Sequence, residues 1–259
     1  MKLSGSEIII ESLKKEGVDY IFGYPGGAVL HIYDALFAAK DIKHVLVRHE
    51  QGATHAADGY ARACNKPGVV LVTSGPGITN CVTGIATAHM DSIPMIVISG
   101  QVSRQYVGSD AFQEADATGI TRPICKHNFL INDRESIADT FRKAFIIATT
   151  GRPGPVIIDI PKDLTDPNVK IDFEYKKNIK IRSYKIKMNE DDNKIEEAAK
   201  ILCSAKKPMI YSGGGVILSK ASKELIKLTK LLNYPITNTL MGLGAYPSSC
   251  LLYTSPSPR

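Results

Sequence analysis

Residues 47–62 read VRHEQGATHAADGYAR and place one carboxylate, Glu50, two residues after an apolar run. The run HVLVR (44–48) predicts a strand, and the small residues after Glu50 predict a helix. Ligands of open parallel sheets bind at the carboxyl ends of the strands, so an acid there could exchange a proton with a bound molecule. The alternative is an acid that only stabilises the helix N-terminus, which is typically worth about 0.3–1 kcal/mol.

Two glycine turns follow other predicted strands. YPGGA (24–28) comes after VDYIFG, and SGPGITN (74–80) ends GVVLVTS. Glycine allows sharp turns and close approach of the backbone to a ligand, and such turns can direct N–H groups toward a developing anion. We predict that these turns and Glu50 form one pocket at one edge of the sheet. Taken singly, each could be an ordinary connection, with Thr79 or Asn80 near a helix cap.

Several better-known motifs are excluded by single residues. A zinc-binding H-E-x-x-H motif would need histidine where Ala53 stands. The turn 74–80 lacks the G-K-[ST] of a P-loop, and Asn80 replaces the last glycine of a dinucleotide fingerprint. SGGGVI (212–217) resembles half a nucleotide-binding turn, but Leu218 stands at its third glycine position.

The elements that position these residues are strands alternating with helices. Short β-branched runs bounded by Gly, Pro or Ser predict the strands VDYIFG, HVLVR, GVVLVTS, MIVISG (95–100) and VIIDI (156–160). Continuous apolar strands separated by helices predict an α/β fold, with a doubly wound parallel sheet covered on both faces. The N-terminal MKLSGSEIIIESLKKEG predicts an amphipathic helix with a cap at Ser4 or Ser6.

A second α/β unit is predicted after a basic segment. We place the first domain at 1–169, a basic linker at 170–189, a partial second domain at 190–249, and a tail unlike the rest at 250–259. In the second domain, two helical patterns alternate with the strand signals KPMIYSGGG and PITNTL. Two βα units cannot complete a covered sheet, so we expect this domain to be cut short.

Composition limits the classes of function. Hydrophobic residues make up 44% of the 259-residue chain, and no window approaches the ~18 unbroken apolar residues of a membrane span. Five scattered cysteines contain no C-x-x-C pair, which favours a reducing cytoplasm over a disulfide framework or a zinc site. Segment 170–189 holds seven Lys/Arg residues against two acids and so carries most of the net charge of +6. We interpret it as a linker and expect no nucleic-acid partner.

Two further segments have ordinary explanations. VGSDAFQEAD (107–116) predicts a loop leading into a helix, with Asp110 and Gln113 spaced as a variant capping box. GRPGPVIIDIPKD (151–163) places Arg152 and Lys162 at either end of a strand, where surface positions are expected.

In their order along the chain, seven motifs resemble the large, catalytic subunit of acetolactate synthase, a thiamine-diphosphate enzyme. The motifs are YPGGA, RHEQGATHAADGYAR, TSGPGITN, MDSIPMIVISGQV, SDAFQEAD, GRPGPVIIDIPKD and TLMGLGAYP. The resemblance spans residues 1–249 and implies an N-terminal pyrimidine-binding domain followed by a truncated flavin-binding domain.

The resemblance implies a role for each candidate residue. Glu50 would hydrogen-bond a ring nitrogen of the cofactor's aminopyrimidine and promote removal of the thiazolium proton. The other implied cofactor contacts are Tyr24, Pro25, Gly26 and Gly27 near the reacting carbons, Pro76 and Asn80 beside the aminopyrimidine, and Arg152, Gly213, Gly214, Gly215, Leu240 and Met241 at FAD. Phe112, Gln113 and Lys162 would line the substrate region.

The implied reaction joins pyruvate to a second pyruvate or to 2-oxobutanoate with loss of carbon dioxide, in branched-chain amino acid synthesis. The resemblance also implies Mg²⁺ in a missing third domain, a homodimer, and a small regulatory subunit. Two departures are Ser103, where relatives carry proline, and CLLYTSPSPR (250–259), which we expect to be foreign sequence. Pyruvate oxidase, another thiamine-diphosphate carboligase or decarboxylase, and a non-catalytic flavin- or nucleotide-binding fragment are the alternatives.

Overall fold

The computed structural model describes residues 1–182, 184, 191–250 and 252–253 of the chain. The chain divides into two compact units, Met1–Lys187 and Met188–Arg259, and each is described by itself.

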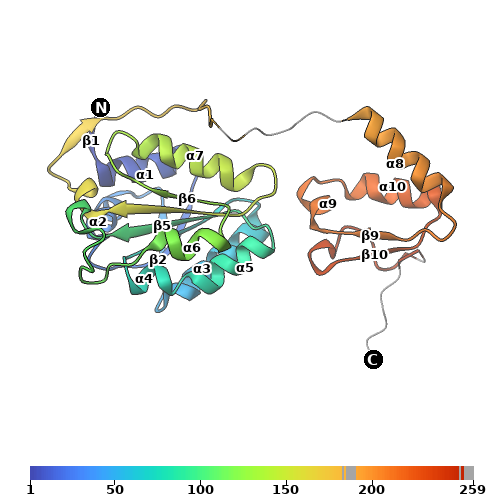
Figure 1. The fold of residues 1–259 in the computed structure, drawn as a ribbon, viewed down its shortest axis with the longest axis horizontal. Helices are drawn as coiled ribbons and strands as arrows, with labels where there is room; N and C mark the ends of the chain where they lie inside the picture. Colours follow the sequence, from blue (N-terminus) through green and yellow to red (C-terminus); the bar gives the residue numbers. More distant parts are fainter. Residues whose placement is uncertain (183, 185–190, 251, 254–259) are drawn as a thin grey trace. The chain divides into compact units, whose positions relative to one another are not determined.

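A six-stranded sheet forms the centre of the first unit (Figure 1). Its strand order is β3-β2-β4-β5-β7-β6, and every neighbouring pair is parallel. The strands are β2 (Tyr20–Tyr24), β3 (Lys43–Leu46), β4 (Gly68–Val72), β5 (Met95–Gln101), β6 (His127–Leu130) and β7 (Pro155–Pro161). The chain goes from β2 to β3 at one edge and then returns to β4, and the strands after it fill the other half of the sheet, with β7 between β5 and β6; this confirms the predicted doubly wound sheet.

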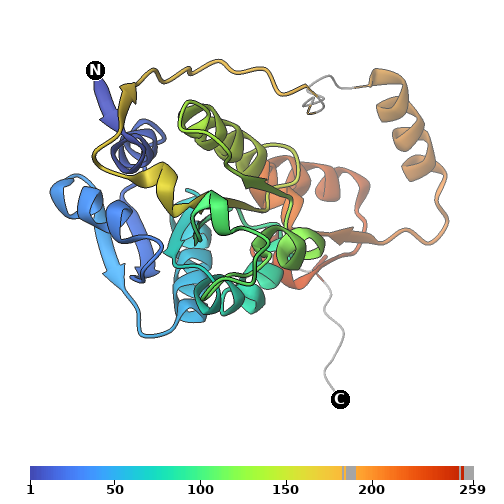
Figure 2. The ribbon, with the colours of Figure 1, turned by 60° about the vertical axis from the view of Figure 1, so that its left-hand side comes forward.

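Helices cover both faces of this sheet. On one face α1 (Gly5–Lys15) packs against α2 (Leu30–Ala38) and α7 (Ile137–Thr149). On the other face α3 (Glu50–Cys64) packs against α5 (Val82–Met90), and α6 (Ala117–Thr121) contacts α5. Figure 2 shows the same two layers from a second direction. Because both faces are covered, all residues of β4, β5 and β7 are buried, as the continuous apolar runs predict.

The first helix begins where the sequence predicts. Ser4 is the N-cap of α1 and its hydroxyl accepts from the Glu7 N–H, while the Glu7 carboxylate accepts from the Ser4 N–H at 2.8 Å. This is a complete capping box, so the chain enters α1 with its first amides satisfied.

Part of the predicted linker lies on the first unit. Strand β8 (Lys170–Asp172) pairs antiparallel with β1 (Lys2–Ser4), a small sheet that the sequence patterns do not predict. Farther along, the Tyr175 hydroxyl donates to Glu16, and the Tyr184 hydroxyl donates to the Thr150 carbonyl oxygen at 2.8 Å. Residues 183 and 185–189 of the linker prediction lie outside the described residues, and its limits stay a prediction.

The second unit contains two βα units, as predicted. Its elements are α8 (Asp192–Ser204), β9 (Ile210–Ser212), α9 (Gly214–Leu218), α10 (Ser222–Leu232) and β10 (Ile236–Asn238), and β9 pairs parallel with β10. In the tail, Tyr253 forms a parallel bridge with Ile236. Residues 251 and 254–259 lie outside the described residues, so the foreign origin of 250–259 stays a prediction.

Short helical turns complete both units. They are α4 (Pro76–Thr79), η1 (Arg104–Tyr106), η2 (Arg122–Ile124), η3 (Lys162–Thr165) and η4 (Leu240–Gly242).

The capping box predicted at Asp110 and Gln113 is wrong. Both residues have left-handed backbones, with φ of 56° and 58°, and no helix begins there. The next helix, α6, is instead capped by Asp116, whose carboxylate accepts from the Gly119 N–H at 2.8 Å. The acid inside the loop, Glu114, accepts from the N–H groups of Gly108 and Ala111 and therefore closes the loop on itself.

One carboxyl group lies in the middle of the sheet. Asp159 of β7 is 1% exposed, and its Oδ2 accepts from the Gln101 side-chain amide at 3.0 Å. Its Oδ1 has no hydrogen-bond partner among the described residues. Burial raises the pKa of Asp159 from its ordinary value of 3.8 to about 7.

This raised pKa predicts a pH-dependent stability. The unfolded chain ionises Asp159 near pH 4 and the folded chain near pH 7, so the free energy of unfolding falls as pH rises between these values. Asp159→Asn has no such titration. Urea denaturation should therefore show wild type losing about 2–3 kcal/mol relative to this variant between pH 5 and pH 8. If the free energies of unfolding of wild type and Asp159→Asn differ by the same amount at pH 5 and pH 8, Asp159 is not a buried acid that stays neutral in the folded protein.

Candidate functional site

Glu50 is the first residue of α3 and follows β3 at the carboxyl edge of the sheet. Although it occupies a helix N-terminus, it is only 8% exposed. Its Oε2 accepts from the Asn80 side-chain amide at 2.9 Å, so its partner comes from a different turn. A carboxyl group that serves only the helix dipole needs neither this burial nor this partner, which favours the chemical interpretation over the structural one.

The glycine turns lie at the same edge because they follow the parallel strands β2 and β4, and their backbones approach other segments closely there. A Cβ placed on Gly26 would lie 2.5 Å from Cβ of Thr73, just past the end of β4. The Thr73 hydroxyl accepts from the Ala28 N–H at 3.3 Å. Around Gly27, by contrast, no described residue beyond its chain neighbours lies within 4 Å of such a Cβ. The turn 24–28 is thus fixed on one side and open on the other.

The second glycine turn meets the loop 107–116. Gly75 has φ +57°, and a Cβ there would lie 2.6 Å from the Gln113 carbonyl oxygen. Pro76 follows as the first residue of α4, and Asn80 caps the end of that helix. The loop that carries Gln113 therefore rests on the turn that supplies the partner of Glu50.

The structure gathers most of the residues that the sequence singles out. Tyr24, Pro25, Gly26, Gly27, Glu50, Pro76, Asn80, Phe112, Gln113 and Lys162 lie at the carboxyl edge of the sheet or in loops that leave it. Tyr24 is 42% exposed and Phe112 is 87% exposed, so both present aromatic rings to the surroundings. The predicted common edge of the turns is confirmed, whereas their roles stay predictions.

Arg152 lies elsewhere in the first unit. It precedes β7 and is therefore at the amino edge of the sheet. Its guanidinium donates to Ser92 Oγ at 2.8 Å and to the carbonyl oxygens of His89 and Met90 at 3.2 and 3.1 Å. Within this unit Arg152 satisfies the end of α5, as a positive charge at a helix C-terminus does.

Two neighbours of Glu50, the partly buried Tyr33 and the buried Cys81, were not found from the sequence. Burial raises the pKa of the Tyr33 hydroxyl, and the charge of Glu50 raises it further. The Cys81 thiol pKa is raised by the same two causes in the same order. Both groups therefore stay uncharged beside the carboxylate. A single tyrosine and a single cysteine in apolar surroundings resemble core residues, so the sequence carries no signal for them.

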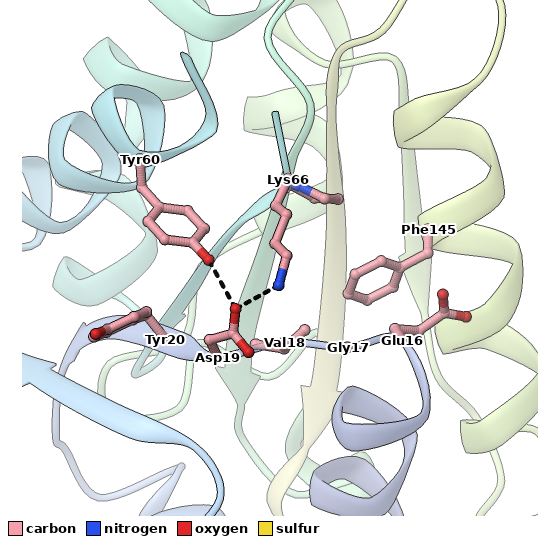
Figure 3. A pocket seen from close by; sticks show the side chains of 9 residues that line it. Glu16, Gly17, Val18, Asp19, Tyr20, Tyr60, Lys66 and Phe145 are labelled. Atoms are coloured by element: carbon pink, nitrogen blue, oxygen red, sulfur yellow. Dashed lines mark hydrogen bonds and ion pairs between the residues drawn. The ribbon is translucent and has the colours of Figure 1, made fainter. Parts of the chain in front are cut away.

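A small cavity of about 180 Å³ lies at the opposite, amino edge of the sheet (Figure 3). Asp19 accepts there from the Tyr60 hydroxyl at 3.3 Å and from the Lys66 ammonium. These polar groups satisfy one another, as the dashed lines in Figure 3 show. This cavity lies apart from Glu50 and is not the predicted pocket.

The second unit brings its glycine turn against the turn after β10. A Cβ on Gly214 would lie 3.0 Å from the Met241 carbonyl oxygen, and Leu240 is 82% exposed. At the ends of the two strands, the Ser212 hydroxyl and both polar atoms of the Asn238 side chain are buried without partners among the described residues. Buried polar atoms of this kind fit a polar ligand. Ser212 and Asn238 were not among the residues predicted from the sequence, although polar residues that end strands in this way are a usable signal.

The described residues contain neither a metal-binding cluster nor a membrane-spanning helix. In that part of the chain, no group of three or more His, Cys, Asp or Glu side chains is placed to hold a metal ion. Nor does that part contain a helix of the length and apolar character needed to cross a membrane.

Comparison with known families decides what this arrangement is. Residues 3–120 match the family described as thiamine pyrophosphate enzyme, N-terminal TPP binding domain, and residues 195–257 match the thiamine pyrophosphate enzyme central domain. The chain belongs to the thiamine pyrophosphate enzyme family. Its first unit is the domain that binds thiamine diphosphate in that family, and the buried Glu50–Asn80 pair with the open turn at Gly27 fits a polar heterocycle.

Three individual relatives show which members of this family the chain resembles. The chain is 56% identical over 248 residues to the acetolactate synthase large subunit of Haemophilus influenzae, covering 96% of this chain and 43% of that protein. It is 51% identical over 247 residues to the acetolactate synthase isozyme 3 large subunit of Escherichia coli (95% and 43% of the two chains), and 52% identical over 246 residues to a probable acetolactate synthase large subunit of Methanocaldococcus jannaschii (95% and 42%). The resemblance found from the motifs is confirmed. The chain spans about 43% of the length of these relatives.

The Glu50–Asn80 contact predicts a non-additive pair of substitutions. Asn80→Leu leaves a buried carboxylate without its donor and should lower the free energy of unfolding by about 1–3 kcal/mol. Adding Glu50→Met removes the unpaired acceptor as well and should restore most of that loss. Chemical denaturation of the two single variants and the double variant measures the coupling. Additive effects contradict a direct contact in the folded protein.

Proposed function

We propose that this chain is the N-terminal part of a thiamine-diphosphate-dependent acetolactate synthase large subunit. The proposal rests on the buried carboxyl group of Glu50, held by Asn80 at the carboxyl edge of the sheet. The names of the relatives support the specific reaction, which joins pyruvate to pyruvate or to 2-oxobutanoate with loss of carbon dioxide.

In this proposal thiamine diphosphate supplies the carbon nucleophile, and the chain binds and orients it. Glu50 holds a proton at a ring nitrogen of the aminopyrimidine, in a position that excludes water. Pro76 and Asn80 flank the ring. Tyr24, Pro25, Gly26 and Gly27 line the pocket near the reacting carbons.

The substrate side of the proposed pocket is formed by other segments. Phe112 supplies an apolar wall, Gln113 a polar contact, and Lys162 a positive charge beside the pocket mouth. A cation and an amide suit the carboxylate and carbonyl groups of 2-oxo acids.

The complete polypeptide would supply what this chain does not. We assign Mg²⁺ and the diphosphate contacts to a further domain, and we propose a homodimer with a possible small regulatory subunit, acting in the cytoplasm. The name "large subunit" of several relatives supports the regulatory partner.

The second unit would bind FAD in this proposal. The turns after β9 and β10 contain the proposed contacts Gly213, Gly214, Gly215, Leu240 and Met241. Ser212 and Asn238, whose buried polar atoms have no partner among the described residues, support a polar ligand there. Arg152 is the proposed flavin contact from the first unit.

The first test replaces the acid in the complete polypeptide. Glu50→Gln can still accept from Asn80 but cannot hold or release the proton, so acetolactate formation should fall by about 10²–10⁴-fold. Glu16→Gln is the matched control, because the Glu16 side chain is 9% exposed and pairs with Arg142, away from Glu50. Its rate should stay within about threefold of wild type.

A loss below threefold in Glu50→Gln contradicts the role of Glu50. Formation of hydrogen peroxide or acetyl phosphate in place of acetolactate assigns the protein to the pyruvate oxidase alternative. The 259-residue chain alone, without the diphosphate site, should form no acetolactate. Acetolactate formation by this chain alone contradicts the assignment of the diphosphate site to a further domain.

The second test concerns the flavin. Gly214→Val places a branched side chain where even a Cβ lies 3.0 Å from the Met241 carbonyl oxygen, so FAD should bind the complete protein at least about tenfold more weakly. Ile217→Val, on the same helix, is the control and should leave binding unchanged. Flavin absorbance per chain after dialysis measures the effect. Equal flavin content in both variants contradicts the proposed site.

A further inference from the structure

The Gln101 side chain joins three segments at the end of β5. It is 4% exposed, and its Nε2 donates to the Ala115 carbonyl oxygen at 2.8 Å and to Asp159 Oδ2 at 3.0 Å. Its Oε1 accepts from the Val102 N–H at 2.8 Å. Both amide hydrogens and the amide oxygen are therefore used, which fixes the orientation of the group.

The segment that Gln101 holds is the loop with Phe112 and Gln113. Phe112 is 87% exposed, so the packing of its ring does not hold the loop in place. Asp110 and Gln113 have left-handed backbones, which non-glycine residues adopt at a cost, so the conformation needs support from outside the loop. Glu114 closes the loop on itself, whereas Gln101 ties its end to the sheet.

Asp159 in turn fixes Gln101. It lies on the adjacent strand, paired in register with Ser99, and is 1% exposed. A buried carboxyl group is costly unless its partners repay the lost hydration. Burial raises the Asp159 pKa to about 7, so the acid is largely neutral below that pH. The buried Asp159 carboxyl group is costly, and it accepts from the Gln101 amide, all of whose hydrogens are used. We infer that Asp159 serves to orient Gln101 and not only to fill space.

We propose that Gln101 and Asp159 are positioning residues that hold the loop 107–116 against the Gly75 turn, and so place Phe112 and Gln113 beside Glu50. The inference deepens the proposed function and rests on it only where it assigns the loop to substrate. Neither residue touches the substrate in this arrangement. Loss of either frees the loop and leaves the pair Glu50–Asn80 intact.

The first experiment measures the loop itself in the 259-residue chain, by hydrogen–deuterium exchange of residues 107–116. Gln101→Leu removes the bond to Ala115, and Asp159→Ala removes the acceptor that orients Gln101. Both should speed exchange in the loop by about 5–10-fold, the effect of one lost hydrogen bond. Asp159→Asn keeps an acceptor for Gln101 in a neutral group and should restore wild-type exchange.

Asn128→Leu is the matched control. Asn128 Nδ2 also donates to a backbone carbonyl oxygen, that of Thr118 at 2.8 Å, but this bond ties β6 to α6 and not to the loop. It should leave exchange in 107–116 unchanged. Gln101→Asn keeps the amide and shortens its reach, so it should reproduce Gln101→Leu if the latter does not fold. Loop exchange that rises no more in the Gln101 and Asp159 variants than in Asn128→Leu overturns the proposal.

The second experiment measures the consequence for substrate in the complete polypeptide. Gln101→Leu should raise KM for pyruvate by about fivefold and change kcat by less than about twofold, because a free loop weakens binding and leaves Glu50 in place. Asn128→Leu should change neither value. An unchanged KM in Gln101→Leu overturns the role in substrate placement. If wild type forms no acetolactate, the proposed function fails, whereas the exchange experiment still decides whether the pair holds the loop.

Discussion

The hydrogen bond between Glu50 and Asn80 is the interaction on which the candidate site depends. A carboxyl group that is 8% exposed needs a partner, and this partner lies 30 residues later in the chain. The two residues meet because β3 and β4 lie on either side of β2, all three parallel, and because α3 and α4 begin at the same edge. The parallel sheet thus turns two distant segments into one site.

Close backbone contacts complete this edge. Gly26 lies against Thr73, and Gly75 lies against the backbone of Gln113, at distances that a side chain would not permit. Each contact brings a turn or loop from a different strand toward Glu50. The glycines therefore determine how near the segments come, while Asn80 determines which way the acid points.

The sequence predicts the sheet because its central strands are continuous apolar runs, and it predicts α1 from an amphipathic pattern that follows possible caps at Ser4 and Ser6. It does not predict β6, where His127 and Asn128 interrupt the apolar pattern, or the three-residue pair β1–β8. The spacing of Asp110 and Gln113 predicts a capping box, but both residues have left-handed backbones, and Glu114 closes a loop there by accepting from the N–H groups of Gly108 and Ala111. Roles that arise only from three-dimensional neighbours, as for Tyr33 and Asp159, leave no local pattern to recognise.

We propose that Glu50 meets the thiamine ring in a pocket closed to water. A crystal structure of the complete protein with thiamine diphosphate bound tests it most directly. We expect a Glu50 carboxyl oxygen within about 2.6–3.2 Å of an aminopyrimidine nitrogen, with Asn80 still donating to the other oxygen. A Glu50 side chain in bulk solvent, with the ring bound elsewhere, contradicts it.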